Sequence, residues 1–357
     1  MYDVIIVGGG VTGSIASQQL SKMGYRVLLA EKSEMPREKS CSGMLIEKAI
    51  RLVQSYVNTD IPHSVTCEPR QNKGLIFYDE QGKIYKFEQN ALNIWRDRFD
   101  HWLLIKSEEA GTEIRQNTTV LSCEDMSDHV NVQMQKGGDV FTETAHIVIV
   151  CTGAISPIRD RLLGNSMKYV TTYQQFLHGN INLDSHYFYA FMGQNLSGYD
   201  AWFNVKDDYL IFGVADTDAS NVDNHYVNFA AYMAEHFNAK VRETGKAERW
   251  VMPSIIPGCP LHFGKGRILF AGEAAGFLNP MGEGISCGVE SAYTAAYSIQ
   301  QTFPKGKGVN EDDLLKAYVA NTRNLHSYMK RQWAFVGGIS STFSHMKKKA
   351  LMEQKKF

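Results

Sequence analysis

The sequence predicts an α/β fold in which a domain built on a parallel sheet is interrupted by an inserted antiparallel sheet and followed by C-terminal helices. Residues 1–31 read as strand, glycine turn, helix and strand in immediate succession. Residues 169–215 are rich in Tyr, Phe, Trp and Val and are divided by turn residues, which is typical of antiparallel strands. The segments from about residues 292 and 311 onward predict the closing helices.

The first thirty-one residues predict a Rossmann-like dinucleotide site. The strand-like run Val4–Val7 leads into Gly8, Gly10 and Gly13, and a helix-like segment and a second apolar run end on Glu31. Gly8 permits the tight turn, Gly10 lets backbone N–H groups approach a pyrophosphate, and Gly13 lets helix and strand pack closely. The helix N-terminus favours phosphate, and Glu31 is placed to accept hydrogen bonds from a ribose diol. A glycine turn without a ligand is the alternative, and the flanking strand, helix and acid argue against it.

Composition narrows the class of protein. The chain has 357 residues, of which 44% are apolar and 21% charged, enough for one large domain or two coupled ones. It has no long apolar run and starts directly on a strand, so we expect no membrane span, no signal peptide and a cytoplasmic location. A net charge of −1 gives no case for nucleic acid.

The cysteines indicate neither a disulfide framework nor a metal site. They are scattered along the chain without a C-x-x-C pair, so we expect most of them to be reduced core residues. The six are Cys41, Cys67, Cys123, Cys151, Cys259 and Cys287.

The remaining elements are predicted in order from periodicity and turn residues. They are a helix over 45–57, a hairpin of strands 75–78 and 84–87, a helix over 95–110, several strands over 112–150, a helix over 226–237 and a strand over 267–271. Within the inserted sheet we expect turns at 178–180 and 206–208. The aromatic residues of this sheet suit either the wall of an apolar pocket or packing for stability alone.

A second glycine-rich stretch, over residues 268–286, points to a flavin. A nicotinamide enzyme needs only the first motif, whereas FAD also presents a ribityl chain and an isoalloxazine ring. Glu273, after the strand, is placed to accept a hydrogen bond from a ribityl hydroxyl, and the N–H groups of the helix starting near Gly282 to Ile285 would stabilise negative charge at flavin N1 and O2. We therefore expect an FAD-binding domain in three pieces, 1–75, 96–165 and 259–303, with a substrate domain of 76–95 and 166–258 and C-terminal helices over 304–357.

The order and spacing of these motifs resemble the flavoproteins of the p-hydroxybenzoate hydroxylase structural class, and within them the geranylgeranyl reductase-like branch. The matching segments are Arg96–Asp100 (R-x-x-F-D), Gly272–Phe277 (G-D-A-A-G-F) and 39–45 (K-P-C-G-G-G-L). The compact length and residues 202–215 look closest to the short bacterial CbrA-type oxidoreductases of that branch.

The resemblance implies a set of cofactor-binding residues. They are Gly8, Gly10, Thr12, Gly13, Glu31, Lys32, Cys41, Ser42, Gly43, Arg96, Val120, Thr152, Gly153, Gly272, Glu273, Pro280, Gly282, Gly284 and Ile285. The chain also departs from the family pattern. Thr152 stands where the family has Asp, Glu273 replaces another Asp, one residue is missing between Pro280 and Gly282, and the Y-x-W-x-F-P signature is blurred to 199–204. We expect the shortened loop to be tighter.

Two of the implied residues have alternative roles, and a third residue, Trp202, is expected to join one of them at the substrate. The resemblance places Cys41 beside the reactive face of the ring, where the thiol either takes part in the chemistry or packs against the flavin. Arg96 either meets the cofactor or is an arginine on the surface of its helix. We expect Trp202 to lie on the same side of the ring as Cys41, with substrate between them, so that both would be catalytic residues.

The implied activity is that of an FAD-dependent oxidoreductase that reduces a carbon–carbon double bond of a small apolar substrate, of which isoprenoids are one candidate class, with NAD(P)H as electron donor. The alternatives are a flavin monooxygenase that hydroxylates an aromatic substrate through a C4a-hydroperoxide, and a flavin-binding sensor without enzymatic activity. The basic residues Lys347–Lys349, Lys355 and Lys356 are either a peripheral membrane contact or a solvated tail. The oligomeric state is left open.

Overall fold

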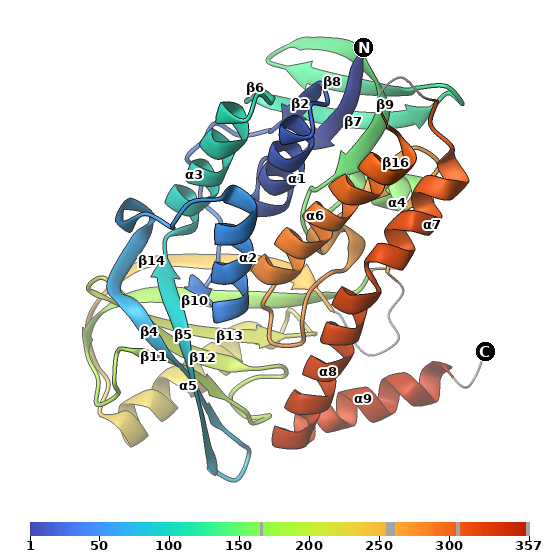
Figure 1. Ribbon diagram of the computed structural model, residues 1–357. Helices are drawn as coiled ribbons and strands as arrows, with labels where there is room; N and C mark the ends of the chain where they lie inside the picture. Colours follow the sequence, from blue (N-terminus) through green and yellow to red (C-terminus); the bar gives the residue numbers. More distant parts are fainter. Residues whose placement is uncertain (165–166, 255–260, 305–307, 355–357) are drawn as a thin grey trace.

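The computed structural model describes residues 1–164, 167–254, 261–304 and 308–354; for residues 347 and 349–354 it describes the backbone alone. Within these residues the chain forms two eight-stranded sheets, called sheet A and sheet B, with helices packed around them (Figure 1). Cys259 and the tail lysines Lys355 and Lys356 lie outside the described residues, as do the side chains of Lys347 and Lys349.

Sheet A is the Rossmann-like sheet, in the order β15-β16-β9-β1-β2-β6, with β8 joining β9 and β7 joining β8. The parallel part of this sheet consists of β16, β9, β1, β2 and β6. Because β1 lies near the centre of the sheet and is covered on both faces, its residues Val4–Val7 are almost completely buried. The strands are β1 (Tyr2–Val7), β2 (Val27–Ala30), β6 (Glu113–Arg115), β7 (Thr118–Asp125), β8 (Val130–Lys136), β9 (Asp139–Val150), β15 (Gly264–Lys265) and β16 (Ile268–Phe270).

Helices α1, α3 and α6 lie side by side over one face of sheet A (Figure 1). The α1 helix begins directly after β1, so its N-terminus stands at the carboxyl end of the parallel strands, where nucleotides bind in such sheets. The helices around this sheet are α1 (Val11–Lys22), α2 (Glu47–Val57), α3 (Arg96–Glu109), α4 (Pro157–Leu163), α6 (Ile285–Thr302) and α7 (Glu311–Asn321), with short 3₁₀ turns η1 (His63–Val65) and η2 (Gly272–Ala275).

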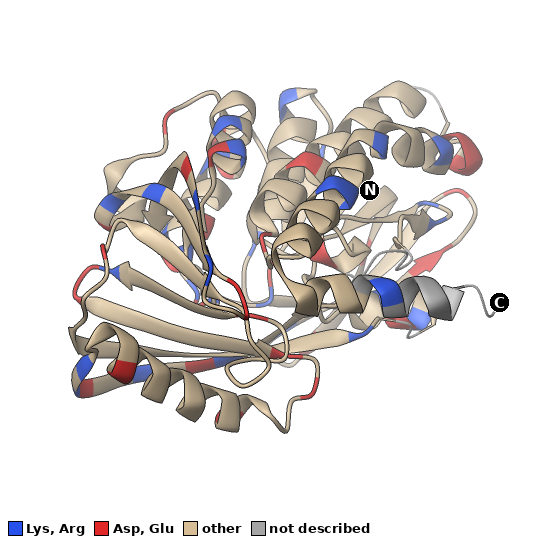
Figure 2. Cartoon of the chain, turned by 90° about the horizontal axis from the view of Figure 1, so that it is seen from below, with Lys and Arg blue, Asp and Glu red and all other residues tan. Residues whose placement is uncertain are grey.

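Sheet B has the order β14-β10-β13-β12-β11-β4-β5-β3. Helix α5 (Val222–Phe237) covers one face of this sheet (Figure 2). Phe191, Phe203 and Phe212 of the strands form the core of this face with Phe229 of the helix. Alternate residues of the same strands point to the other face, towards sheet A. The strands are β3 (Met44–Leu45), β4 (Thr66–Tyr78), β5 (Ile84–Ile94), β10 (Tyr169–Asn180), β11 (Tyr187–Phe191), β12 (Ala201–Lys206), β13 (Tyr209–Asp216) and β14 (Lys240–Pro253).

The C-terminal helices α8 (Arg323–Ile339) and α9 (Ser341–Gln354) join the two sheets. Phe335 of α8 packs edge-on against Phe77 and Phe87 of the β4–β5 hairpin, with ring centroids 6.5 and 5.0 Å away. At the hairpin tip, the Glu80 carboxylate accepts hydrogen bonds from Ser340 Oγ (2.8 Å) and the backbone N–H of Thr342 (3.0 Å), which caps α9. No helix in the described part of the chain is long and apolar enough to cross a membrane.

The α/β architecture, the hairpin and the turn before Tyr209 are confirmed, and three expectations need correction. The turn expected at 178–180 is wrong because β10 runs through Asn180, and Gly179 instead allows close approach of β14, since a Cβ there would lie 2.3 Å from the Lys240 carbonyl oxygen. Sheet B is not wholly antiparallel, because β11 pairs with β4 in parallel. The first strand of the hairpin starts at Thr66, ahead of the boundary expected after residue 75, and β14 was not foreseen.

Candidate active site

The glycine turn after β1 is shaped by two close backbone approaches. Gly8 has a φ of +104°, and a Cβ there would lie 2.7 Å from the carbonyl oxygen of Cys151. A Cβ on Gly13 would lie 1.9 Å from the Gly8 carbonyl oxygen. Gly8 therefore makes the tight turn and Gly13 packs α1 against it, while Gly10 and Thr12 at the start of α1 face a large cavity.

Glu31, one residue beyond β2, is held beside this turn. Its carboxylate accepts hydrogen bonds from the backbone N–H groups of Gly9 (2.7 Å) and Ser33 (3.0 Å), and the residue is only 4% exposed. Both contacts fix the direction of the carboxylate while it still lines the cavity. The geometry therefore suits acceptance of ribose hydroxyls at the position that the sequence predicts.

A buried ionic network links the turn to α3. Asp100, fully buried, accepts two hydrogen bonds from Arg96, at 2.7 Å from Nε and 2.9 Å from Nη2. Arg37 Nη2 lies 3.3 Å from the same carboxylate, and Arg37 Nη1 is buried without a hydrogen-bond partner in the described chain. Arg96 is thus no exposed helix residue, since its side chain is 12% exposed and lines the cavity. Arg37 was missed, and its only sequence signal is its place six residues after Glu31.

The second glycine stretch meets the first across Thr12. Gly272 has a φ of +62°, and a Cβ there would lie 2.5 Å from Thr12 Oγ1, so glycine is needed for η2 and α1 to touch. The next side chain, Glu273, lies between Gly153 and Gly284, with its oxygens 4.0 and 3.2 Å from the positions where their Cβ atoms would stand. The segments after β9 and before α6 therefore converge on one carboxylate.

Two buried oxygens at this convergence have no partner among the described residues: Glu273 Oε2 and Thr152 Oγ1. Leaving a buried polar atom unpaired costs roughly 1–3 kcal/mol, so such atoms normally meet a ligand or water. Glu273 faces the cavity from the end of the strand–turn unit, where the sequence places a ribityl chain. The unpaired oxygens thus fit the hydroxyl groups of FAD.

The loop before α6 is closed by one side chain. Asn279 Oδ1 accepts the backbone N–H groups of Met281 (3.0 Å) and Glu283 (3.1 Å), and Gly282 turns with a φ of +69°. The Glu283 carboxylate then accepts the Ser286 N–H (2.7 Å) in the first turn of α6, and burial raises its pKa. One of the N–H groups expected to face flavin N1 and O2 is therefore occupied by the chain itself.

The Cys41 loop is clamped to sheet B. Lys206 Nζ donates to the Cys41 carbonyl oxygen (3.3 Å), and Asn204 Nδ2 donates to that of Ser42 (3.0 Å). Burial lowers the pKa of Lys206, which is 1% exposed. These two β12 residues were not foreseen, because nothing in the sequence indicates a lysine buried against a loop about 165 positions away.

Sheet B supplies an apolar wall. The indole ring of Trp202 lies over Gly213, its pairing partner on β13. A Cβ on Gly213 would lie 2.0 Å from that ring, so the glycine makes room for it. Its indole N–H is buried without a partner among the described residues. Other wall residues come from four further strands and from α8. They are Leu75, Phe77, Phe87, Phe188, Met252 and Phe335.

All of these features line one cavity of about 1530 Å³ between sheet A, sheet B and α8. The predicted residues that line it are Gly8, Gly10, Thr12, Glu31, Lys32, Cys41, Ser42, Arg96, Val120, Thr152, Gly153, Trp202, Glu273, Gly282, Gly284 and Ile285. Gly13, Gly43, Gly272 and Pro280 do not line it. The first three shape the backbone through close approaches, and the carbonyl of Pro280 accepts the Tyr199 hydroxyl (2.6 Å).

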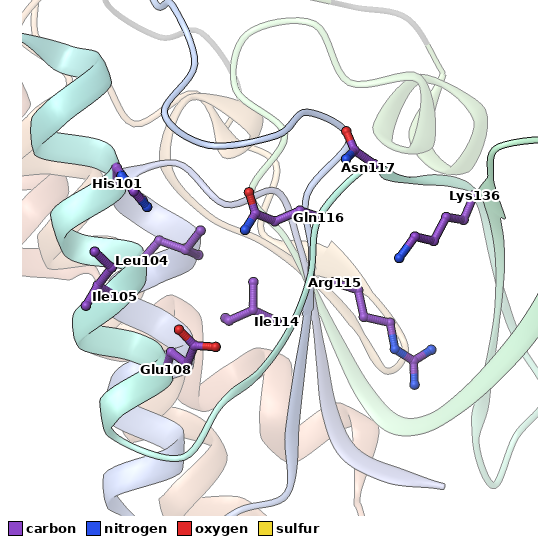
Figure 3. Close-up of a pocket in the computed structure, with 9 residues that line it drawn as sticks. All are labelled: His101, Leu104, Ile105, Glu108, Ile114, Arg115, Gln116, Asn117 and Lys136. Carbon is purple, nitrogen blue, oxygen red and sulfur yellow. The ribbon is translucent and has the colours of Figure 1, made fainter.

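A smaller pocket of about 230 Å³ lies elsewhere, between α3 and β6. Figure 3 shows His101, Leu104 and Glu108 on α3 facing Ile114 and Gln116. None of the predicted site residues lines it. No group of three or more His, Cys, Asp or Glu side chains suited to a metal gathers in the part of the chain that the structure describes.

Fold and site together define an FAD-dependent oxidoreductase. The sequence model of the FAD binding domain family matches residues 1–251, so the chain belongs to that family. The digeranylgeranylglycerophospholipid reductase of Methanococcus vannielii is 24% identical over 322 residues, covering 84% of this chain and 77% of that protein.

Solved structures agree with the fold. A geranylgeranyl bacteriochlorophyll reductase-like protein from Thermoplasma acidophilum matches with a TM-score of 0.80 at 18% identity, over 97% of this chain and 90% of that one. The myxobacterial chondrochloren halogenase, an FAD-dependent enzyme, matches with a TM-score of 0.76 at 17% identity, over 97% and 86% of the two chains. These two structures show the fold alone; the match to the FAD binding domain family and the similarity to a digeranylgeranylglycerophospholipid reductase confirm the resemblance to geranylgeranyl reductase-like flavoproteins.

Proposed function

We propose that this protein is an FAD-dependent reductase that saturates a carbon–carbon double bond of a small apolar substrate, with NAD(P)H as electron donor. The observation that carries the proposal is that the dinucleotide groove and the apolar wall of sheet B are one cavity, with Cys41 on the loop clamped to that wall. The name of the Methanococcus vannielii relative, a digeranylgeranylglycerophospholipid reductase, supports an isoprenoid-type substrate.

The cofactor would be held along the sheet A side of the cavity. Gly10 and the start of α1 would meet the pyrophosphate, Glu31 the adenosine ribose, and Glu273 with Thr152 the ribityl hydroxyls. When bound and reduced, FAD supplies the hydride for such a reaction.

The chain's own residues would place and protect the substrate. Phe77, Phe87 and Phe188 would exclude water from the apolar part of the cavity. Trp202 would pack against the substrate, and the Cys41 thiol would serve as a proton source for the second carbon of the double bond. The clamp from Lys206 and Asn204 would keep that thiol in place.

A flavin monooxygenase acting on an aromatic substrate is the second candidate, because the aromatic wall suits a planar ring and a single fold hosts both activities. Oxygen dependence separates the two. A reductase forms product from a digeranylgeranylglycerophospholipid in the absence of oxygen, and in air its oxygen consumption does not follow the amount of product. Substrate-dependent oxygen uptake with an oxygenated product would select the monooxygenase.

A further inference from the structure

The apolar wall of sheet B contains two polar groups that the proposed reaction does not use, the carboxyl group of Asp200 and the indole N–H of Trp202. Asp200 and Trp202 both line the cavity and are 6% and 9% exposed. Asp200 directly precedes β12 and its carbonyl oxygen still pairs with the Ala215 N–H of β13, while Trp202 is the second residue of the strand. Two residues apart along extended chain, their side chains share one face of the sheet. The residues facing the cavity from neighbouring strands, Ala215 and Phe188, have no polar side-chain atoms.

Neither group is paired within the part of the chain that the structure describes. Among the described residues, the indole Nε1 of Trp202 is buried without a hydrogen-bond partner, and no hydrogen bond or ion pair joins the Asp200 carboxyl group to another side chain or backbone group. Such atoms are expensive in a folded protein unless a ligand pairs them, and these two face a cavity large enough to hold one.

The backbone that carries Asp200 is fixed. Its carbonyl oxygen accepts hydrogen bonds from the Ala215 N–H (2.9 Å) and Ser197 Oγ (2.8 Å). The adjacent Tyr199 hydroxyl donates to the Pro280 carbonyl oxygen on the loop before α6 (2.6 Å). The backbone at Asp200 therefore cannot move without breaking these contacts, so the point from which its side chain enters the cavity is preorganised.

The chemistry of the two groups selects the ligand. An indole N–H only donates, and a carboxyl group in its protonated form donates through its O–H. Burial raises the pKa of Asp200 to about 7, so a large share of the carboxyl group is protonated near neutral pH. Two donors in an apolar wall match an oxygen acceptor, whereas a pure hydrocarbon would leave both unpaired.

We propose that Asp200 and Trp202 form a hydrogen-bonding subsite for an uncharged acceptor oxygen, such as a ketone carbonyl, carried by an otherwise apolar substrate. This inference rests on the proposed function only in taking the substrate as the occupant of the cavity. The subsite narrows the class of substrates to apolar molecules that carry an uncharged acceptor oxygen.

Binding of a matched pair of probes to the oxidised, FAD-loaded full chain tests the subsite by calorimetry. Geranylacetone and the hydrocarbon with a methylene in place of its carbonyl differ only in the acceptor. We expect the ketone to bind about tenfold more tightly, as for a site built to hydrogen-bond its ligand. Asp200→Leu and Trp202→Phe should each reduce this preference. Glu88→Gln, at an exposed carboxylate lining the same cavity, should leave it unchanged.

A pH series provides a second readout that remains available if Asp200→Leu fails to fold. The ketone preference should fall as the pH rises through about 7, because the ionised carboxyl group can no longer donate. Asp200→Asn keeps an N–H donor that does not ionise, so the fall in ketone preference near pH 7 should disappear in this variant. Other charged groups also line the cavity, among them Lys39, Glu273 and Glu283 on the sheet A side and Arg331 on α8. A pH dependence that persists in Asp200→Asn therefore does not arise from Asp200.

Equal binding of both probes by the wild-type protein, or an unchanged preference in Asp200→Leu, would overturn the subsite. Both measurements avoid turnover, so a failure of the reductase proposal would leave a ketone preference intact. Equal binding of the two probes by the wild-type protein would likewise leave the reductase proposal standing, because anaerobic turnover tests that proposal separately.

Discussion

The Lys206 ammonium group on β12 donates a hydrogen bond to the carbonyl oxygen of Cys41, and its Nζ and Cε lie 2.4 Å from the position that a Cβ on Gly43 would occupy. A lysine from sheet B therefore fills the space left by a glycine in the loop after Glu31. The position of the Cys41 thiol depends on this pairing.

Gly43→Ala should consequently destabilise the fold more than an ordinary glycine substitution. Gly43 has a φ of +83°, and its Cβ would also lie 2.3 Å from the Ile94 carbonyl oxygen. Gly82 has a φ of +80° with nothing within 4 Å, so Gly82→Ala isolates the backbone strain of roughly 1 kcal/mol. Urea unfolding should give a clearly larger loss for Gly43→Ala, and equal losses would remove the clamp from the account.

Gly10→Val should empty the FAD site without unfolding the protein. A Cβ on Gly10 would meet the flexible end of Arg37 at 3.1 Å and Asp100 Oδ2 at 4.0 Å, but a valine would occupy the pyrophosphate position on the cavity side. Gly138→Val, in open space on the β8–β9 turn, is the matched control. Flavin absorbance of the purified variants gives the readout, and full occupancy in Gly10→Val would refute the assignment of this loop.

Glu31→Ala and Glu273→Ala should each weaken FAD binding, by roughly 1.5–3 kcal/mol for loss of a charged hydrogen bond. Glu31 also holds the turn through the Gly9 N–H, so its replacement should loosen the turn, whereas Glu273 Oε2 has no described partner. Titration of apoprotein with FAD measures both. If Glu31→Ala altered only the use of NAD(P)H, the dinucleotide on this loop would be the wrong one.

Glu80 should stabilise the docking of α9 in a pH-dependent way. Burial alone would raise its pKa, but the hydrogen bonds from Thr342 and Ser340 outweigh it and hold the pKa at about 2, below the ordinary 4.5. The stabilisation is therefore complete above about 4.5 and is lost as the pH falls towards 2. Hydrogen exchange at neutral pH should be faster at 340–346 in Glu80→Gln than in wild type, and identical exchange would show that the cap contributes nothing.

Cys41→Ser and Trp202→Ala test the two predicted catalytic residues. Cys41→Ser should keep FAD and its spectrum but slow turnover, because a serine hydroxyl is the weaker acid. Trp202→Ala should chiefly raise KM through lost contact with substrate. Steady-state kinetics of the pair provides the check, and normal turnover of Cys41→Ser would return the cysteine to a packing role.

Local patterns predicted much of this site, because a strand, a glycine turn, a helix and the acid after the second strand follow one another within thirty-one residues. What the sequence did not predict depends on partners far away in the chain. Most of β14 is exposed, and its first ten residues are mostly polar or small without a regular alternation of apolar and polar positions. Its pairing with β10 is what makes it a strand. Arg37 pairs with Asp100, and Lys206 donates to the carbonyl oxygen of Cys41. Folding brings both pairs together, so the role of Arg37 and Lys206 cannot be inferred from their neighbours in the sequence.

The proposed activity is tested most directly by an anaerobic single turnover. Enzyme reduced in the absence of oxygen is mixed with a digeranylgeranylglycerophospholipid, and flavin absorbance and product mass are followed together. The account predicts that the flavin is reoxidised by the lipid itself, in step with gain of two hydrogens per double bond. A flavin that stays reduced until oxygen is admitted, with an oxygenated product, would contradict it.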